Sequence, residues 1–206
     1  MRITAEAKQR TRERLLEVAH RLLARRGLGD VTTREVADQA GLAHGTLFNY
    51  FPTKEDLALA LCRQLLDQAE ADYAARRRGD EGLEEDLFAH AAAGLRRLQP
   101  YRAWAGALLG AAFRPGAGAT DARDDDPAAL QSRHLASVRD VLVRHRGPAA
   151  ANPLALHLYW TLWLGVLGWW ALDPSEHQHE TLAVLDHSLR MLAASLDGAA
   201  APGDAP

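Results

Sequence analysis

The side chains best suited to reading nucleic acid lie between Thr32 and Lys54 (TTREVADQAGLAHGTLFNYFPTK). His44 and Thr46 can donate or accept hydrogen bonds at base edges, and Gly45 between them lets the backbone come close. Phe48 lies one helical turn further on and can contact the methyl group of thymine. These residue types at this spacing predict a surface that reads DNA sequence.

Further polar residues surround that surface and are placed to reach phosphate groups rather than bases: Thr33, Arg34, Asn49, Tyr50 and Lys54. Phosphate contacts fix the register of a protein on the duplex but carry no sequence information. Leu47 and Phe51 are four residues apart, so we expect both to face inward and to hold the reading helix against its neighbours.

Two short helices must position these side chains. Thr32 and Glu35 have the spacing of a capping box, which predicts a helix over about Thr33 to Ala40. Gly41 ends it, and a second helix is predicted over about His44 to Tyr50. Two short helices around a glycine-containing turn form a helix-turn-helix, whose second helix lies in the major groove. From the turn pattern alone, a three-helix fragment without a DNA role stays open.

The charge distribution favours the same end of the chain. Residues 1–54 hold ten Lys or Arg against six Asp or Glu, a net charge of +4, whereas the 206-residue chain carries −3, which leaves −7 for the rest. A basic head on an acidic body fits a polyanionic partner for the head only. The single cysteine, Cys62, excludes an internal disulfide and fits a reducing cytoplasm. The first residues are charged and lack the apolar core of a signal peptide.

The stretch TTREVADQAGLAHGTLFNYFPTKEDL closely resembles the DNA-binding signature of the tetracycline-repressor (TetR) family. The resemblance covers about Leu15 to Leu61 and is carried by these residues: Thr33, Val36, Ala37, Ala40, Gly41, Leu42, Gly45, Thr46, Leu47, Phe48, Tyr50, Phe51, Lys54, Glu55, Asp56 and Leu57. It implies a three-helix DNA-binding head, a connecting helix, and a variable helical body that binds a small molecule and forms a homodimer. The implied location is the bacterial cytoplasm, at the nucleoid.

By the same resemblance, the recognition positions are His44, Gly45, Thr46, Phe48, Asn49 and Tyr50, with Thr33 and Lys54 on backbone phosphates. One departure is Ala43, where the family often has a capping Ser or Asp. Another is His44, at a position that varies and helps to set the operator sequence. The operator therefore cannot be deduced from this chain.

We predict an all-α fold with two domains. Residues 1–52 form the helix-turn-helix DNA-binding domain, and residues 53–198 form the ligand-binding and dimerisation domain, in which 53–75 is the connecting helix. Residues 199–206 are expected to be a disordered tail. A polar break follows the connecting helix at Arg76 to Gly82 and is the strongest candidate for a domain boundary. Further body helices are predicted over 83–98, 101–113, 130–145, 153–172 and 175–197, with a Gly/Asp/Pro-rich loop at 114–127.

The segment Leu154 to Leu172 is 19 residues long, with only His157 and Thr161 polar. Its length approaches that of a membrane span, but a helix that is apolar all round can equally be buried in a bundle. We expect the second arrangement and no membrane partner. In it, this helix and the last one pair with their copies in a second subunit through Trp160, Trp169, Leu182, Leu185, Leu189, Leu192 and Leu196.

A ligand pocket is expected between the remaining body helices. Its candidate lining residues are Phe88, Trp104, Leu108, His134, Tyr159 and Trp163. For any one of them, a plain core position is the stronger alternative. Few charged residues lie in these helices, so the expected ligand is largely apolar or aromatic, such as an acyl chain or a planar drug-like molecule.

Metal and catalytic chemistry find little support in the sequence. His177 and His179 lie two residues apart beside Glu176 and Glu180, which places them on different faces of a helix, and Asp124 to Asp126 lack EF-hand spacing. We predict no cofactor, no metal and no enzyme. The predicted function is a homodimeric, ligand-responsive transcription regulator, a repressor that leaves a near-palindromic operator when the ligand binds. The alternatives are a nonspecific DNA-binding or scaffold protein and a helical small-molecule carrier or enzyme.

Overall fold

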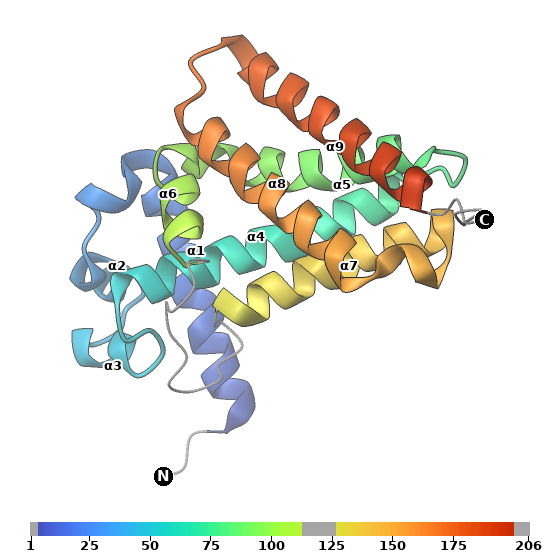
Figure 1. Cartoon of the computed structure of the whole chain (residues 1–206). Coiled ribbons are helices and arrows are strands. Elements are labelled where there is room, and N and C mark those ends of the chain that lie inside the picture. Colours follow the sequence, from blue (N-terminus) through green and yellow to red (C-terminus); the bar gives the residue numbers. More distant parts are fainter. Residues whose placement is uncertain (1–3, 113–126, 200–206) are drawn as a thin grey trace, which may run out of the picture.

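The computed structural model describes residues 4–112 and 127–199, and these residues form helices without any strand. Figure 1 shows the chain from α1 to α9. The helices in chain order are α1 Ala5–Asp30, α2 Thr33–Gln39, α3 His44–Phe48, α4 Lys54–Arg76, α5 Leu83–Leu98, α6 Arg102–Ala112, α7 Pro127–Arg146, α8 Pro153–Leu172 and α9 His179–Ala199, with short 3₁₀ turns at Gln99–Tyr101, Pro148–Ala151 and Glu176–Gln178. The predicted all-α fold is confirmed.

The first three helices gather at one end of the molecule, and α4 runs from them into the body (Figure 1). The inner side of this head is apolar: Leu15, Leu23, Val36, Leu47 and Phe51 are each at most 2% exposed. These side chains belong to all three head helices and to the segment before α4. Their burial together removes apolar surface from water and fixes α3 on α1 and α2.

Side-chain caps start the helices where the sequence predicted them. Thr53 accepts a hydrogen bond from Asp56 N at 3.0 Å, and Asp56 accepts one from Thr53 N at 3.0 Å, which completes a capping box at the start of α4. Asn152 caps α8 in the same manner by accepting from Ala155 N at 3.0 Å. These caps satisfy amide groups that a helix leaves without partners in its first turn.

The body is a bundle in which α5 lies along α4, while α8 lies between α6 on one side and α9 on the other. Gly106 of α6 is the closest approach to α8, since a Cβ atom there would lie 2.6 Å from the Cβ of Ala171. Any larger residue would push the two helices apart. No helix in the described part of the chain is long and apolar enough to cross a membrane.

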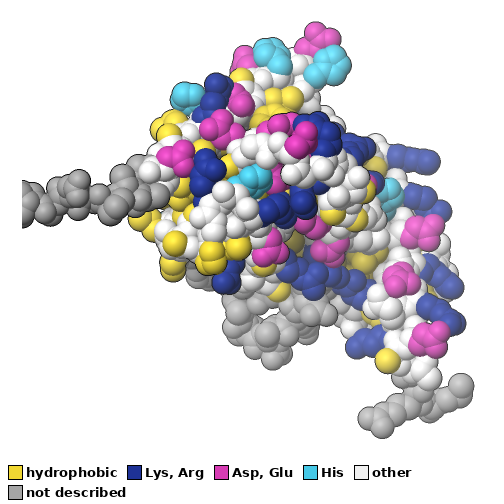
Figure 2. All heavy atoms as spheres, turned by 90° about the vertical axis from the view of Figure 1, so that its right-hand side faces the viewer, with side chains coloured by type: hydrophobic (Ala, Val, Ile, Leu, Met, Phe, Trp, Pro, Cys, Tyr) yellow, Lys and Arg dark blue, Asp and Glu magenta, His cyan; other side chains and the backbone are white. Residues whose placement is uncertain are grey.

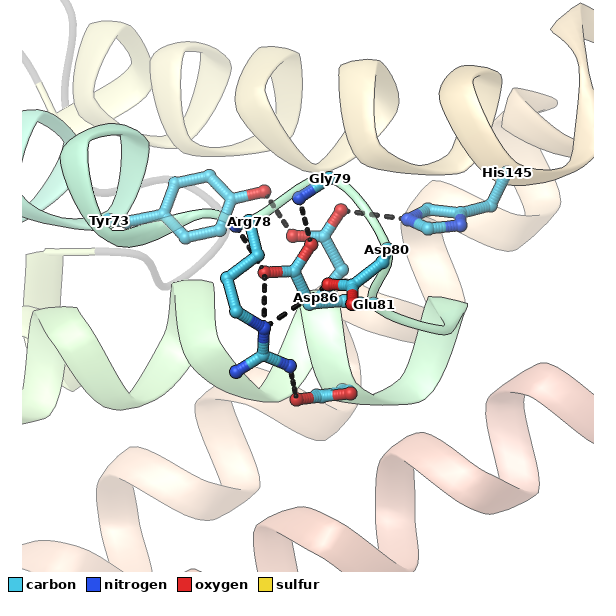
Figure 3. Close-up of polar contacts among 8 residues, drawn as sticks. Tyr73, Arg78, Gly79, Asp80, Glu81, Asp86 and His145 are labelled. Atoms are coloured by element: carbon cyan, nitrogen blue, oxygen red, sulfur yellow. Dashed lines mark hydrogen bonds and ion pairs between the residues drawn. The ribbon is translucent and has the colours of Figure 1, made fainter.

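A buried carboxylate joins α4, α5 and α7 (Figure 3). Asp86 is 1% exposed and accepts hydrogen bonds from Tyr73 at 2.6 Å, Arg144 at 2.6 Å and His145 at 2.7 Å. Burial raises the pKa of Asp86, but these hydrogen bonds and the positive Arg144 outweigh it and lower the pKa overall. The carboxylate therefore stays charged and keeps the three helices in register.

The polar break after α4 is a tight connection inside the body. Glu81 accepts from the backbone amides of Arg78 at 2.6 Å and Gly79 at 2.7 Å, and Arg78 contacts Glu85 at 2.9 Å (Figure 3). The connection turns the chain so that α5 packs against α4. Polar composition marks a turn as readily as a linker, so a domain boundary at this break stays a prediction.

Candidate functional site

The turn between α2 and α3 is built on its glycine. Gly41 has φ of 68°, in the left-handed region, and its amide donates to Asp38 O at 3.1 Å. The next amide, that of Leu42, reaches back to Ala37 O at 2.9 Å. These bonds close the end of α2 and set the direction in which α3 leaves, as the sequence predicted. Ala43 provides no side-chain cap for α3, which agrees with its departure from the family pattern.

The residues predicted to read bases lie on the outer side of α3. His44, Gly45 and Asn49 are exposed, and Phe48 is 41% exposed. Thr46 is less exposed than these residues and is half-buried. Phe48 thus keeps apolar surface in water on a five-residue helix, as the predicted contact with the methyl group of thymine requires. The other predicted DNA-contacting residues lie around it: Arg34 is exposed, and Thr33 and Tyr50 are half-buried.

Two contacts orient His44. Its Nε2 atom forms a hydrogen bond with the Thr33 hydroxyl at 3.2 Å, so the starts of α2 and α3 are linked. Its ring meets the Phe48 ring edge-on, with centroids 4.9 Å apart. Because the histidine is held from both sides, it presents one ring orientation to a partner. The sequence placed these three residues on one surface but did not predict the Thr33–His44 bond.

Lys54 was predicted to contact a phosphate, but in the structure its side chain points into the protein. Its ammonium donates to Leu28 O at 2.7 Å, in the last turn of α1, and to Val31 O at 3.3 Å, in the connection from α1 to α2. Two of the three ammonium donors are thus used inside the head. The predicted phosphate contact is untested, and the structure adds a bracing role that joins the start of α4 to the end of α1.

In the body, the predicted ligand-contacting residues divide into two groups. His134, Tyr159 and Trp163 come together: His134 Nε2 and the Tyr159 hydroxyl are 3.0 Å apart, and the His134 ring stacks on Trp163 with centroids 5.1 Å apart. Phe88 lines a separate hollow beside Trp170 and α9. Trp104 packs edge-on against Tyr101, and Leu108 lies half-buried against the core.

A cavity of about 90 Å³ lies between α4, α5 and α7, next to the first group. It is lined by Leu66, Asp67, Ala69, Glu70, His90, Ala91, Gly94, Leu130, Arg133, His134 and Ser137. Of the predicted residues, only His134 lines it. The lining is also more polar than expected, because the mainly apolar stripes of α5 and α7 carry polar side chains at the positions that meet α4.

Glu70 is the polar centre of this cavity. Its carboxylate accepts from Ser137 Oγ at 2.8 Å and lies 2.9 Å from His90 Nε2. Burial raises the pKa of Glu70, but the hydrogen bonds and the nearby His90 lower it overall. Burial lowers the pKa of His134 well below its ordinary value, and the neighbouring His90 lowers it further. The cavity therefore holds an ionised carboxylate beside a neutral imidazole.

The residues predicted for dimerisation are also divided. Trp160, Leu185, Leu189 and Leu192 are at most 6% exposed within the single subunit, and Leu196 is half-buried. Leu185, Leu189 and Leu192 form a leucine seam on α9, and this seam is buried where α9 packs against α5 and α8 of its own chain. Only Trp169, 48% exposed, and Leu182, 37% exposed, face outward.

The outward face of α8 is apolar, and of its residues only Trp169 was predicted from the sequence for the subunit contact. It carries Leu154, Leu158, Trp169 and Leu172, which are between 40% and 84% exposed. Figure 2 shows hydrophobic side chains gathered along its left-hand edge, the side to which α8 faces. Gly165 and Gly168 lie on the same face, and a Cβ atom at either would meet nothing within 4 Å. A second helix could therefore approach this face closely.

Comparisons with known proteins agree with the geometry. The model of the bacterial regulatory proteins of the tetR family matches residues 15–61. The repressor KstR2 of Mycobacterium tuberculosis is 39% identical over 72 residues, which is 35% of this chain and 36% of KstR2. The chain thus aligns with about a third of the length of this relative. The relatives are named as transcription regulators and not as enzymes.

Two solved structures share the fold across most of the chain. A tetR-family regulator from Streptomyces coelicolor superposes with a TM-score of 0.64 at 20% identity, covering 93% of this chain and 83% of that one. RolR, solved with resorcinol, gives a TM-score of 0.65 at 20% identity and covers 97% of both chains. At this identity the likeness establishes the fold of head and body together.

Proposed function

We propose that this chain, whose residues 15–61 match the model of the bacterial regulatory proteins of the tetR family, is a repressor that binds operator DNA as a homodimer and is released by a small molecule. The observation that carries the proposal is the outer side of α3, where Phe48 and His44 face solvent and Thr33 holds the histidine in place. A buried face holds this helix to the head, so the exposed face is free to enter a major groove.

Two heads are needed for a near-palindromic operator, with recognition helices about 34 Å apart. We assign the contact between subunits to the outward face of α8, with the exposed Leu182 and Met191 of α9 beside it. Large exposed apolar side chains in one row are costly in water unless a partner covers them. The two glycines of this row suit a close helix crossing. This replaces the leucine seam, which is already buried in its own subunit.

The effector site of the proposal is the cavity between α4, α5 and α7. Helix α4 supplies Glu70 to the cavity and Lys54 to the brace on the head. These residues are sixteen positions apart, which is about 24 Å along the helix axis at 1.5 Å per residue. A ligand that shifts α4 would move the head with it. For release, the ligand must bind the shifted state more tightly than the DNA-bound state.

The proposal is tested by measuring the affinity of the protein for DNA from around its own gene. The affinity for random DNA of the same length, at the same salt concentration, is the comparison. A specific regulator binds its site about a thousandfold or more tightly than unrelated sequence. Equal affinities with a steep salt dependence would instead indicate a nonspecific DNA-binding protein. The proposed location is the cytoplasm, where the operator lies.

A further inference from the structure

We propose that the cavity beside His90 takes a small uncharged molecule with a hydroxyl group, an alcohol or a phenol, and that this hydroxyl donates a hydrogen bond to His90 Nδ1. The inference rests on the effector role proposed above for the cavity and names the class of the effector. It replaces the expectation of a largely apolar ligand.

The first step is the state of the His90 ring. His90 is 6% exposed, and its Nε2 atom lies 2.9 Å from the Glu70 carboxylate. An ionised carboxylate only accepts hydrogen bonds, so Nε2 must carry a hydrogen, and the ligand proposed here is for the form of the ring that carries no other. The Nδ1 atom then has a lone pair. This atom is buried and has no hydrogen-bond partner among the described residues.

The second step is the cost of that lone pair. A buried acceptor without a partner loses its hydration and gains nothing in return. The surrounding groups do not supply a hydrogen bond to Nδ1. Tyr73 and His134 contact His90 through their aromatic rings, whose centroids each lie 5.2 Å from the centroid of the His90 ring. The Nε2 atom of His134 forms a hydrogen bond with the Tyr159 hydroxyl instead. A ligand that supplies a donor would therefore bind where the protein has an unmet acceptor.

The third step is charge and size. Glu70 carries a negative charge at the cavity, so a carboxylate ligand would be repelled. The volume of about 90 Å³ is smaller than the roughly 150 Å³ cavity known to hold benzene. Asp67 and Arg133 line the mouth with side chains about half exposed, at 48% and 54%. The site therefore suits a molecule of at most one small ring, with part of it in the mouth.

Calorimetric titration of the full chain with phenol, anisole and benzoate tests this class directly. Anisole keeps the ring and oxygen of phenol but has no hydrogen to donate, and benzoate is an anion of similar size. We expect phenol to bind about ten- to a hundredfold more tightly than either. Equal binding of phenol and anisole, preference for benzoate, or no binding of phenol would each overturn the inference.

Two variants locate the effect at Nδ1. His90→Gln can keep a donor toward Glu70 but has no acceptor at the Nδ1 position, so phenol and anisole should then bind alike. His90→Asn places an amide oxygen near the Nδ1 position and should retain the preference for phenol. The reverse pattern would contradict the assignment to Nδ1. If neither variant folds, the ranking of the three compounds on the natural chain decides.

The DNA readout separates this inference from the proposed function. Phenol that binds with the expected preference but leaves DNA binding unchanged would remove the effector role and leave the site intact. DNA release by anisole or benzoate, with phenol inactive, would keep the effector role and overturn the ligand class.

Discussion

The hydroxyl of Tyr101, in the 3₁₀ turn before α6, forms a hydrogen bond with His20 Nδ1 on α1, and the centroids of the two rings lie 5.8 Å apart. The pair joins the body to the DNA-binding head at residues 81 positions apart in the chain. Tyr101 is 1% exposed, so the bond forms at the inner edge of the contact between head and body. Together with the Lys54 brace, it gives α1 two polar links to the rest of the molecule.

Removing this bond should weaken the link between head and body. Tyr101→Phe deletes only the hydroxyl, and His20→Ala deletes its partner. A double-mutant cycle on the free energy of unfolding should give a coupling of about 0.5 to 1.5 kcal/mol, the usual net value of one hydrogen bond. Strictly additive effects of the two substitutions would show that the bond contributes nothing in solution.

The role of Lys54 can be separated from phosphate binding by Lys54→Met, which keeps the length of the side chain and removes the ammonium. The loss of two hydrogen bonds to backbone carbonyls should lower the free energy of unfolding by about 1 to 3 kcal/mol. If Lys54 only braces the head, the salt dependence of DNA binding should keep its slope. A slope reduced by about 0.9 for each subunit, which is about 1.8 for the dimer, would instead assign Lys54 to a phosphate. Arg34→Met, on the exposed side of α2, is the matched comparison.

Cys62 should make the protein less stable in mild alkali. Burial raises the pKa of its thiol from 9.0 to about 12. The thiol of the unfolded chain ionises above pH 9, so the stability that depends on the neutral buried thiol is complete below pH 9 and is lost as the pH rises toward 12. Between pH 9 and pH 10 the loss is about 1 kcal/mol.

Urea unfolding of the natural chain and of Cys62→Ala at both pH values measures this loss. The variant should be less stable at pH 8 because it leaves a small cavity, but its stability should fall less between pH 9 and pH 10. Tyr73 has a pKa raised to about 12 and contributes to both proteins alike above pH 10. Burial and the nearby Cys62 raise the pKa of Tyr101, so the two proteins are compared at pH 10 and below. Parallel losses in the two proteins would contradict the assignment to Cys62.

The proposed subunit contact predicts that a charge on the outward face of α8 breaks the dimer. Leu158 is 40% exposed in the single subunit, so Leu158→Glu should leave the fold of the subunit unchanged. Sedimentation should show monomers at concentrations where the natural chain is dimeric, because a carboxylate buried at the contact lacks a partner. Ala136→Glu, on an exposed position of α7, should remain dimeric. Dimers of both variants would place the contact elsewhere.

The head could be predicted from sequence because its signals are local. The cap at Thr53, the left-handed glycine at position 41 and the inward faces of Leu47 and Phe51 each depend on residues within a few positions of one another. The helices of the body were predicted for the same reason, from caps and apolar stripes. The prediction at Phe113, the loop at 114–126 and most of the tail lie outside the described residues.

The cavity could not be predicted, because it depends on how three distant helices face one another. Glu70 lies twenty positions from His90 and sixty-seven from Ser137, and neither distance carries a sequence signal. The dimer contact predicted for the leucine seam of α9 depends on the same kind of information. Periodicity shows that a helix has a buried face, but it does not say whether its own subunit or a second copy covers that face.

Whether α3 reads DNA is tested by selecting bound sequences from a random DNA pool, with the natural chain and with a variant that carries both His44→Ala and Thr46→Ala. The natural chain should enrich a near-palindrome whose half-sites lie one or more helical turns apart. The variant should enrich no sequence while weak binding to any DNA survives, because its phosphate contacts remain. A pool left unenriched by the natural chain, or the same sequences enriched by both proteins, would contradict the assignment of α3 as the helix that reads DNA.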